Sequence, residues 1–208
     1  MNQKMMENQT VHEREGQEIR RSQWVALTGI MSGLALLGNY ALVGVPNVEM
    51  GSSILFVTAY VFGFHMAIWC TLIMSIIFGM FNPWGALLPQ IYLCQLAGWF
   101  VVVAAGAIEG RNRGTAPTSQ TSPIEFGVLG AVTTLFFDLI TNLGFSWAFD
   151  LPYFGVVAYG LPYMMVHVTS NFFIFLVVVP VISRLIDRSF GAAIWRNVIE
   201  HPVSLGEE

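Results

Sequence analysis

Long apolar segments alternate with short polar ones along this chain. A membrane-spanning helix needs about 20 predominantly apolar residues. Four segments meet that requirement, and each is bounded by Pro, Gly, Asn or charged residues: 23–44, 86–108, 125–149 and 158–183. The pattern predicts an all-α protein whose helices cross a lipid bilayer.

The apolar segment 51–80 is too long for one upright helix and too short for two full-length ones. A break within FGFHMA, residues 62–67, would divide it into two short helices. Two helices of about 15 residues each would reach only about 22 Å. They would therefore tilt or lie in a thinned part of the bilayer.

The basic residues favour two short helices in 51–80. All nine Lys and Arg lie in an N-terminal tail ending at Arg21, at Arg111 and Arg113, and in a C-terminal flank from Arg184 to Arg196. Cytoplasmic flanks of membrane proteins collect Lys and Arg, and only six crossings put all of these groups on one side. We predict six transmembrane helices, the second and third short, with both termini cytoplasmic.

This topology divides the chain into three parts. A polar cytoplasmic tail, 1–21, has no apolar core of the kind found in a secretory signal. The six-helix domain, 22–188, contains a cytoplasmic loop at 109–123, and a second cytoplasmic tail follows at 189–208. The predicted outer connections are 45–50, 81–85 and 150–157.

The composition supports a multi-pass protein of the cell membrane. The chain is 55% hydrophobic and 11% charged, with a mean hydropathy of +0.63, whereas soluble domains carry roughly 25% charged residues. No basic cluster of the kind that binds nucleic acid is present.

The sequence predicts no catalytic, metal or cofactor site. Lys4 is the single lysine and no GxxxxGK[ST] motif occurs, so the chain cannot bind ATP through a P-loop. Neither HExxH nor GxSxG occurs, and the four histidines have no metal-ligand spacing.

Polar residues nevertheless occur inside the predicted spans. Asp138 and Asn142 lie one helical turn apart in FFDLITN, and an ionisable group in the membrane costs several kcal/mol unless it is paired or hydrated. The last span carries Tyr163, His167 and Asn171 at the spacing of one helix face. These faces are expected to point into the bundle.

The fourth span adds Gln95, with Gln90 close by. Counting along each helix puts Gln95, Asp138 and His167 about 15 Å below the outer ends of their helices. They therefore predict a polar pocket in the outer half of the membrane. Two alternatives remain: Asp138 is a structural lock to His167 or Asn171, and the amide side chains only support helix packing.

Two outer connections add further candidates for the pocket. VPNVEM carries Asn47 and Glu49, and FNPWG carries Asn82 and Trp84. No Lys or Arg occurs at 22–110 or 114–183, so an anionic ligand would find no strong cationic partner. A neutral or cationic small molecule is the preferred ligand.

The chain resembles the substrate-binding S component of energy-coupling factor (ECF) transporters. The resemblance is carried by PNVEM, FNPWGALLPQIYLCQLAGW, GAVTTLFFDLITNLGF and GLPYMMVHVTSNFFIF. It implies capture of a vitamin or related micronutrient outside the cell, and docking on a transmembrane coupling protein with two ABC-type ATPases. The identity of the ligand remains open among thiamine-like, flavin-like, corrinoid and queuosine-precursor molecules.

The resemblance also implies a docking surface on the first helix. Many family members carry Ala-x-x-x-Ala there, which WVALTGIMSGLALLGNYAL lacks. Gly29 and Gly33 have the equivalent small-residue spacing, and Ala26 precedes them by one turn. The alternative for these residues is ordinary packing within the bundle.

Other functional classes remain possible. A small membrane enzyme or membrane-complex subunit could use Asp138 and His167 as acid–base or proton-relay groups. A stand-alone carrier would transport its substrate without any ATPase.

Overall fold

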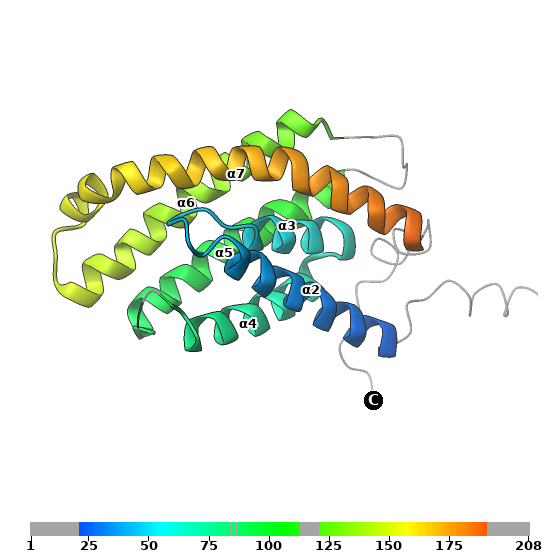
Figure 1. Cartoon of the computed structure of the whole chain (residues 1–208), viewed down its shortest axis with the longest axis horizontal. Helices are drawn as coiled ribbons and strands as arrows, with labels where there is room; N and C mark the ends of the chain where they lie inside the picture. Colours follow the sequence, from blue (N-terminus) through cyan, green and yellow to red (C-terminus); the bar gives the residue numbers. More distant parts are fainter. Residues whose placement is uncertain (1–20, 84, 86, 113–120, 191–208) are drawn as a thin grey trace, which may run out of the picture.

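The computed structural model describes residues 21–83, 85, 87–112 and 121–190. Trp84, almost all of both tails, and residues 113–120 of the predicted loop 109–123 lie outside the described residues. The described part contains six α-helices and no strand (Figure 1). The helices are α2 (Arg21–Ala41), α3 (Gly51–Phe62), α4 (Phe64–Met80), α5 (Pro89–Asn112), α6 (Pro123–Phe149) and α7 (Tyr153–Phe190).

The predicted fold class is confirmed. Four helices, α2, α5, α6 and α7, are long and apolar enough to cross a membrane, and α3 and α4 are shorter apolar helices. The predicted break in 51–80 falls at Gly63, whose φ of 89° separates α3 from α4. Glycine adopts this backbone conformation readily because it has no Cβ.

The short helix α3 forms the centre of the bundle. All 12 of its residues are buried, and it packs against α2, α4, α5 and α7. A helix that is apolar on every side is typically enclosed by other protein elements. At about 1.5 Å per residue α3 is only about 18 Å long, but its neighbours shield it from lipid.

Glycines allow α3 to approach its neighbours closely. A Cβ on Gly106 of α5 would lie 2.5 Å from the Phe56 carbonyl oxygen of α3, and one on Gly110 would overlap the carbonyl group of Tyr60. At the other end of α3, a Cβ on Gly51 would overlap the Asn39 side chain of α2. The two glycines of α5 form a GxxxG pair that allows the backbones of α3 and α5 to pack closely.

The last two helices form a long hairpin at the side of the bundle (Figure 1). Asp150, with a φ of 52°, ends α6, and the Leu151 N–H donates to the Ser146 carbonyl at 3.1 Å. The predicted outer connection 150–157 is therefore too long, because α7 begins at Tyr153 and continues for 38 residues. The missed helix start follows Pro152, a residue that favours the beginning of a helix.

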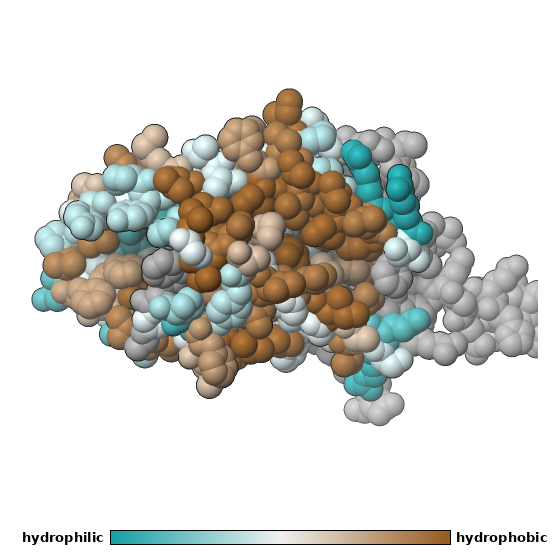
Figure 2. All heavy atoms as spheres, in the orientation of Figure 1, coloured by the Kyte–Doolittle hydropathy of each residue, from teal (hydrophilic) through white to brown (hydrophobic). Residues whose placement is uncertain are grey.

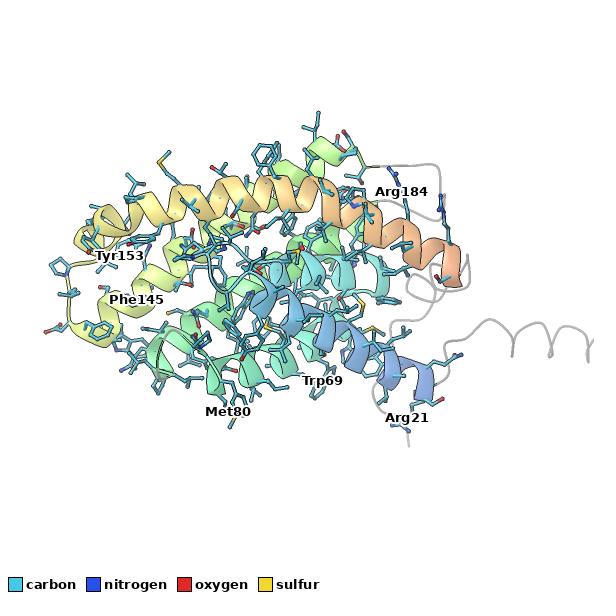
Figure 3. All side chains as sticks on the ribbon, in the orientation of Figure 1. Arg21, Trp69, Met80, Phe145, Tyr153 and Arg184 are labelled. Carbon is cyan, nitrogen blue, oxygen red and sulfur yellow. The ribbon has the colours of Figure 1, made fainter. Side chains whose placement is uncertain are left out.

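The described arginines lie at one end of the bundle. Arg21 and Arg184 lie at this end, opposite Tyr153 (Figure 3), and Arg111 lies in the last turn of α5. Hydrophobic side chains cover the middle of the face shown in Figure 2, and strongly hydrophilic ones gather at the arginine end. This arrangement is the one that the predicted topology requires.

The close packing of α3 against α5 can be tested by a substitution that adds one methyl group to α5. Gly106→Ala is expected to lower stability by about 1–3 kcal/mol, because the added Cβ meets rigid backbone. Gly33→Ala is the matched control, since a Cβ there meets nothing within 4 Å. Thermal unfolding in detergent should show a lower melting temperature for Gly106→Ala alone. Equal melting temperatures would contradict this packing.

The topology can be tested by cysteine labelling in intact cells. In a background with Cys70→Ala and Cys94→Ala, Phe154→Cys should react with a membrane-impermeant maleimide, because Phe154 is 84% exposed and lies in the predicted outer half. Asn112→Cys should react only after the cells are permeabilised. External labelling of Asn112→Cys would overturn the predicted orientation.

Candidate functional site

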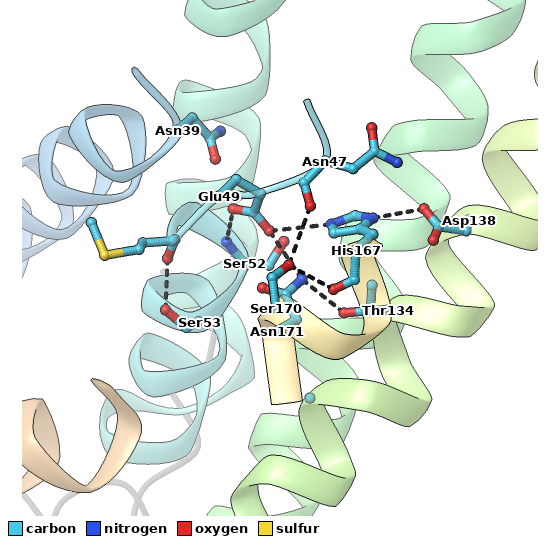
Figure 4. Close-up of polar contacts among 12 residues, drawn as sticks. Asn39, Asn47, Glu49, Ser52, Ser53, Thr134, Asp138, His167, Ser170 and Asn171 are labelled. Carbon is cyan, nitrogen blue, oxygen red and sulfur yellow. Dashed lines mark hydrogen bonds and ion pairs between the residues drawn. The ribbon is translucent and has the colours of Figure 1, made fainter. Parts of the chain in front are cut away.

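Asp138 of α6 and His167 of α7 form a buried pair. The Asp138 Oδ1 and His167 Nδ1 atoms are 2.7 Å apart (Figure 4). Asp138 is only 7% exposed and His167 only 6%. The structure thus joins two residues that the sequence had placed at similar depth on different helices, and it contains the contact to His167 that the structural-lock alternative for Asp138 named.

Glu49, from the connection between α2 and α3, approaches the other side of the imidazole. Glu49 Oε1 lies 3.8 Å from His167 Nε2, so His167 lies between two carboxyl groups (Figure 4). The Ser52 backbone N–H donates to Glu49 Oε2 at 2.8 Å. The Glu49 side chain is 19% exposed, so a residue that the sequence assigned to an outer connection is largely buried among the helices.

Asn171 extends this group by one helical turn. It is fully buried, its Nδ2 donates to Thr134 Oγ1 at 2.9 Å, and the same atom lies 3.5 Å from Glu49 Oε1. We refer to Glu49, Asp138, His167 and Asn171 as the polar cluster. It joins α6, α7 and the α2–α3 connection.

The α2–α3 connection is held against α7 by further hydrogen bonds. Asn47 Nδ2 donates to the Tyr163 carbonyl, and Ser170 Oγ donates to the Asn47 carbonyl, both at 3.2 Å. Asn47 has a φ of 57°, a left-handed conformation that asparagine tolerates better than most residues. This bend allows the connection to contact α7 and to bring Glu49 to the cluster.

The environment of Glu49 favours its charged form. Burial raises the pKa of the Glu49 carboxyl, but the neighbouring His167 imidazole and Ser52 outweigh burial and hold the pKa below its ordinary value. The carboxylate is therefore ionised at neutral pH, which adds a negative charge beside the Asp138–His167 pair.

Three buried atoms of the cluster have no hydrogen-bond partner among the described residues: Asp138 Oδ2, His167 Nε2 and Asn171 Oδ1. Buried polar atoms in folded proteins are nearly always hydrogen-bonded, to protein or to water. These three unpaired atoms make the polar cluster the candidate site for a polar small molecule or water.

The other predicted pocket residues that the structure describes form no side-chain hydrogen bond with the polar cluster. Gln90 and Gln95 of α5 are half-buried, and neither side chain has a hydrogen bond within the described ranges. Asn142 Nδ2 contacts Met164 Sδ at 3.3 Å. Tyr163, four residues before His167, is 53% exposed, and its carbonyl accepts a hydrogen bond from Asn47 of the α2–α3 connection. Asn82 lies in the α4–α5 connection.

Two serines complete the cluster and were missed by the sequence reasoning. Ser52 holds Glu49, and Ser170 Oγ contacts both the His167 carbonyl at 3.0 Å and the Asn47 carbonyl. Ser170 could have been predicted, because it lies one helical turn after His167. Ser52 could not, because it binds Glu49 through its backbone N–H, which every residue except proline has.

A second candidate surface lies on α2. Ala26, Gly29 and Gly33 are all exposed, and a Cβ on either glycine would meet nothing within 4 Å. The alternative that these glycines mediate packing within the bundle is wrong for the described part of the chain. The α2 small-residue face therefore points away from the other helices.

Comparisons with models of protein families, with curated proteins and with solved structures found no match to this chain. The polar cluster and the α2 small-residue face are the two features of the molecule that bear on its function.

The Asp138–His167 contact can be measured as an energetic coupling. Asp138→Asn and His167→Gln should each lower stability by at least about 1.5 kcal/mol, because each removes a charge-assisted hydrogen bond. The double variant should lose less than the sum of the two. Unfolding in mixed micelles provides the measurement, with Asp150→Asn at an exposed helix end as a control. Additive losses would contradict a direct interaction.

Proposed function

We propose that this chain is the substrate-capture subunit of an ECF-type importer in the cell membrane. It binds a vitamin or related micronutrient, neutral or cationic, from the outer side. A transmembrane coupling protein and two ABC-type ATPases act as separate partners and supply the energy. The chain itself then needs no catalytic residue.

The observation that carries this proposal is the polar cluster and its unpaired buried atoms. Asp138 Oδ2 and Asn171 Oδ1 can each accept a hydrogen bond from a ligand, and His167 Nε2 can accept one when the imidazole is neutral or donate one when it is protonated. Stability alone gives little reason for such a cluster, because replacing a buried ion pair with packed apolar residues is often neutral or stabilising. Ionisable residues within membrane segments typically mark substrate or ion sites.

The α2–α3 connection supports capture from the outer side. Glu49 comes from a nine-residue connection, 42–50, rather than from a helix, and it is more exposed than its partners, with 19% of its side chain accessible against 8% for His167. A connection can move more easily than a packed helix. Displacing it would expose the cluster to a ligand arriving from that side.

The α2 small-residue face supports docking on a partner helix. Gly29 and Gly33 face away from the bundle, and small residues at this spacing let two membrane helices approach closely. Because no P-loop occurs in the sequence, ATP hydrolysis would take place on the partner chains.

A second candidate function is proton relay in a membrane enzyme or complex. The observation that favours it is the imidazole between two carboxyl groups, 2.7 Å from Asp138 and 3.8 Å from Glu49. A relay predicts a catalytic partner chain and proton-dependent turnover. Co-purification of the chain from native membranes separates the two functions, because capture predicts ATPases and a coupling protein instead.

Docking and capture can be separated by one substitution. Gly33→Leu should abolish ATPase-dependent uptake, because the larger side chain prevents close helix approach, and should leave the amount of small molecule retained by the purified chain unchanged. Ile30→Leu, at a 57% exposed neighbour, is the control and should retain uptake. Uptake that survives Gly33→Leu, or that needs no ATPase, would contradict the proposal.

A further inference from the structure

The unpaired oxygen atoms of the polar cluster are all acceptors. His167 Nδ1 lies 2.7 Å from Asp138 Oδ1, so Nδ1 carries a hydrogen, whereas Nε2 accepts in the neutral imidazole and donates in the protonated one. Asp138 Oδ2 and Asn171 Oδ1 accept only, and neither has a hydrogen-bond partner in the described part of the chain. These oxygen atoms therefore lack hydrogen-bond donors.

Of the two carboxyl oxygens that contact the imidazole, Glu49 Oε1 has the longer contacts. Its contacts to Asn171 Nδ2 and His167 Nε2 are 3.5 and 3.8 Å long, whereas hydrogen bonds from nitrogen to oxygen are usually about 2.7–3.2 Å. Asp138 Oδ1, by contrast, is held at 2.7 Å. Glu49 Oε1 thus has room for a closer donor, on the most accessible side chain among the three ionisable groups.

The charges around the cluster are unbalanced. An ionised Asp138 and a protonated His167 together have no net charge. The ionised Glu49 then adds a negative charge. The α3 N-terminus offsets part of this charge through the Ser52 N–H on Oε2. No Lys or Arg occurs at 22–110 or 114–183, and Arg21 and Arg184 lie at the end of the bundle opposite Tyr153 (Figure 3). A buried net negative charge is costly unless a cation compensates it.

We propose that the site binds an organic cation with several N–H donors, such as an ammonium or an amidinium, and that Glu49 Oε1 is its anchor. The remaining N–H groups donate to Asp138 Oδ2 and Asn171 Oδ1. The other oxygen of Asp138, Oδ1, fixes the imidazole. This inference rests on the proposed function and narrows its ligand from neutral or cationic to cationic.

Glu49→Gln tests the charge imbalance in the full chain, purified in detergent without added ligand. The glutamine oxygen can still accept the Ser52 N–H, and its amide N–H groups supply the missing donors while the charge is removed. The melting temperature should be unchanged or higher, in contrast to the lower value expected for Asp138→Asn. A decrease as large as that of Asp138→Asn would make Glu49 a structural partner and overturn the inference.

Three molecules of the same shape test the ligand class: benzamidinium, benzamide and benzoate. Titrating the melting temperature of the full chain gives a Kd for each. Benzamidinium should bind at least about tenfold more tightly than benzamide, the worth of a charge-assisted contact, and benzoate should not bind. Glu49→Gln should abolish the advantage of benzamidinium.

The outcomes separate this inference from the proposed function. Equal binding of benzamidinium and benzamide, preferred binding of benzoate, or no binding of benzamidinium would each overturn the cationic ligand class. If benzamidinium and benzamide bind equally and His167→Ala abolishes the binding of both, the polar cluster is still the capture site. Only the inferred preference for a cation is then wrong. Loss of the ATPase requirement for uptake would instead overturn the proposed function and leave the probe result intact.

Discussion

The desolvation of Glu49, Asp138 and His167 is the constraint on which the rest of this structure depends. Ionisable groups inside a bilayer-spanning bundle are tolerated only when they are paired, hydrated or bound to a ligand. Here the 2.7 Å contact of Asp138 with His167 satisfies part of that requirement. Glu49 remains loosely held beside buried atoms that lack partners among the described residues, so the cluster is better suited to receive a ligand than to stabilise the ligand-free chain.

The fold is arranged to bring three distant segments to this point. The central helix α3 is enclosed on all sides, and Gly106 and Gly110 let α5 contact its backbone. Because α3 begins inside the bundle, the connection before it also enters the bundle, as the Met50 N–H donating to the Gly38 carbonyl at 3.3 Å indicates. Glu49 is thereby delivered to α6 and α7, whose hairpin supplies the other ionisable residues.

The helices could be predicted from the sequence more completely than the residues of the candidate site. Apolar length and arginine placement predicted the all-α class and the division of 51–80, since both follow from bilayer thickness and charge. Helix periodicity identified Asp138, His167 and Asn171. Glu49 was named as a pocket candidate from its place in an outer connection, but its contact with His167 was not predicted. The path of a connection depends on tertiary contacts such as those of Asn47 with α7. Tyr163 was expected to point into the bundle but is 53% exposed, because residue spacing alone does not define how far a buried helix face extends.

Native mass spectrometry of the chain released gently from its membrane tests the central claim most directly, because it detects a bound small molecule by its mass alone, whatever that molecule is. Wild type should carry a non-lipid organic adduct of defined mass, and that adduct should be lost from Glu49→Gln and retained by Asp150→Asn. A wild-type chain that carries only lipid and detergent, or an adduct unaffected by Glu49→Gln, would contradict the account.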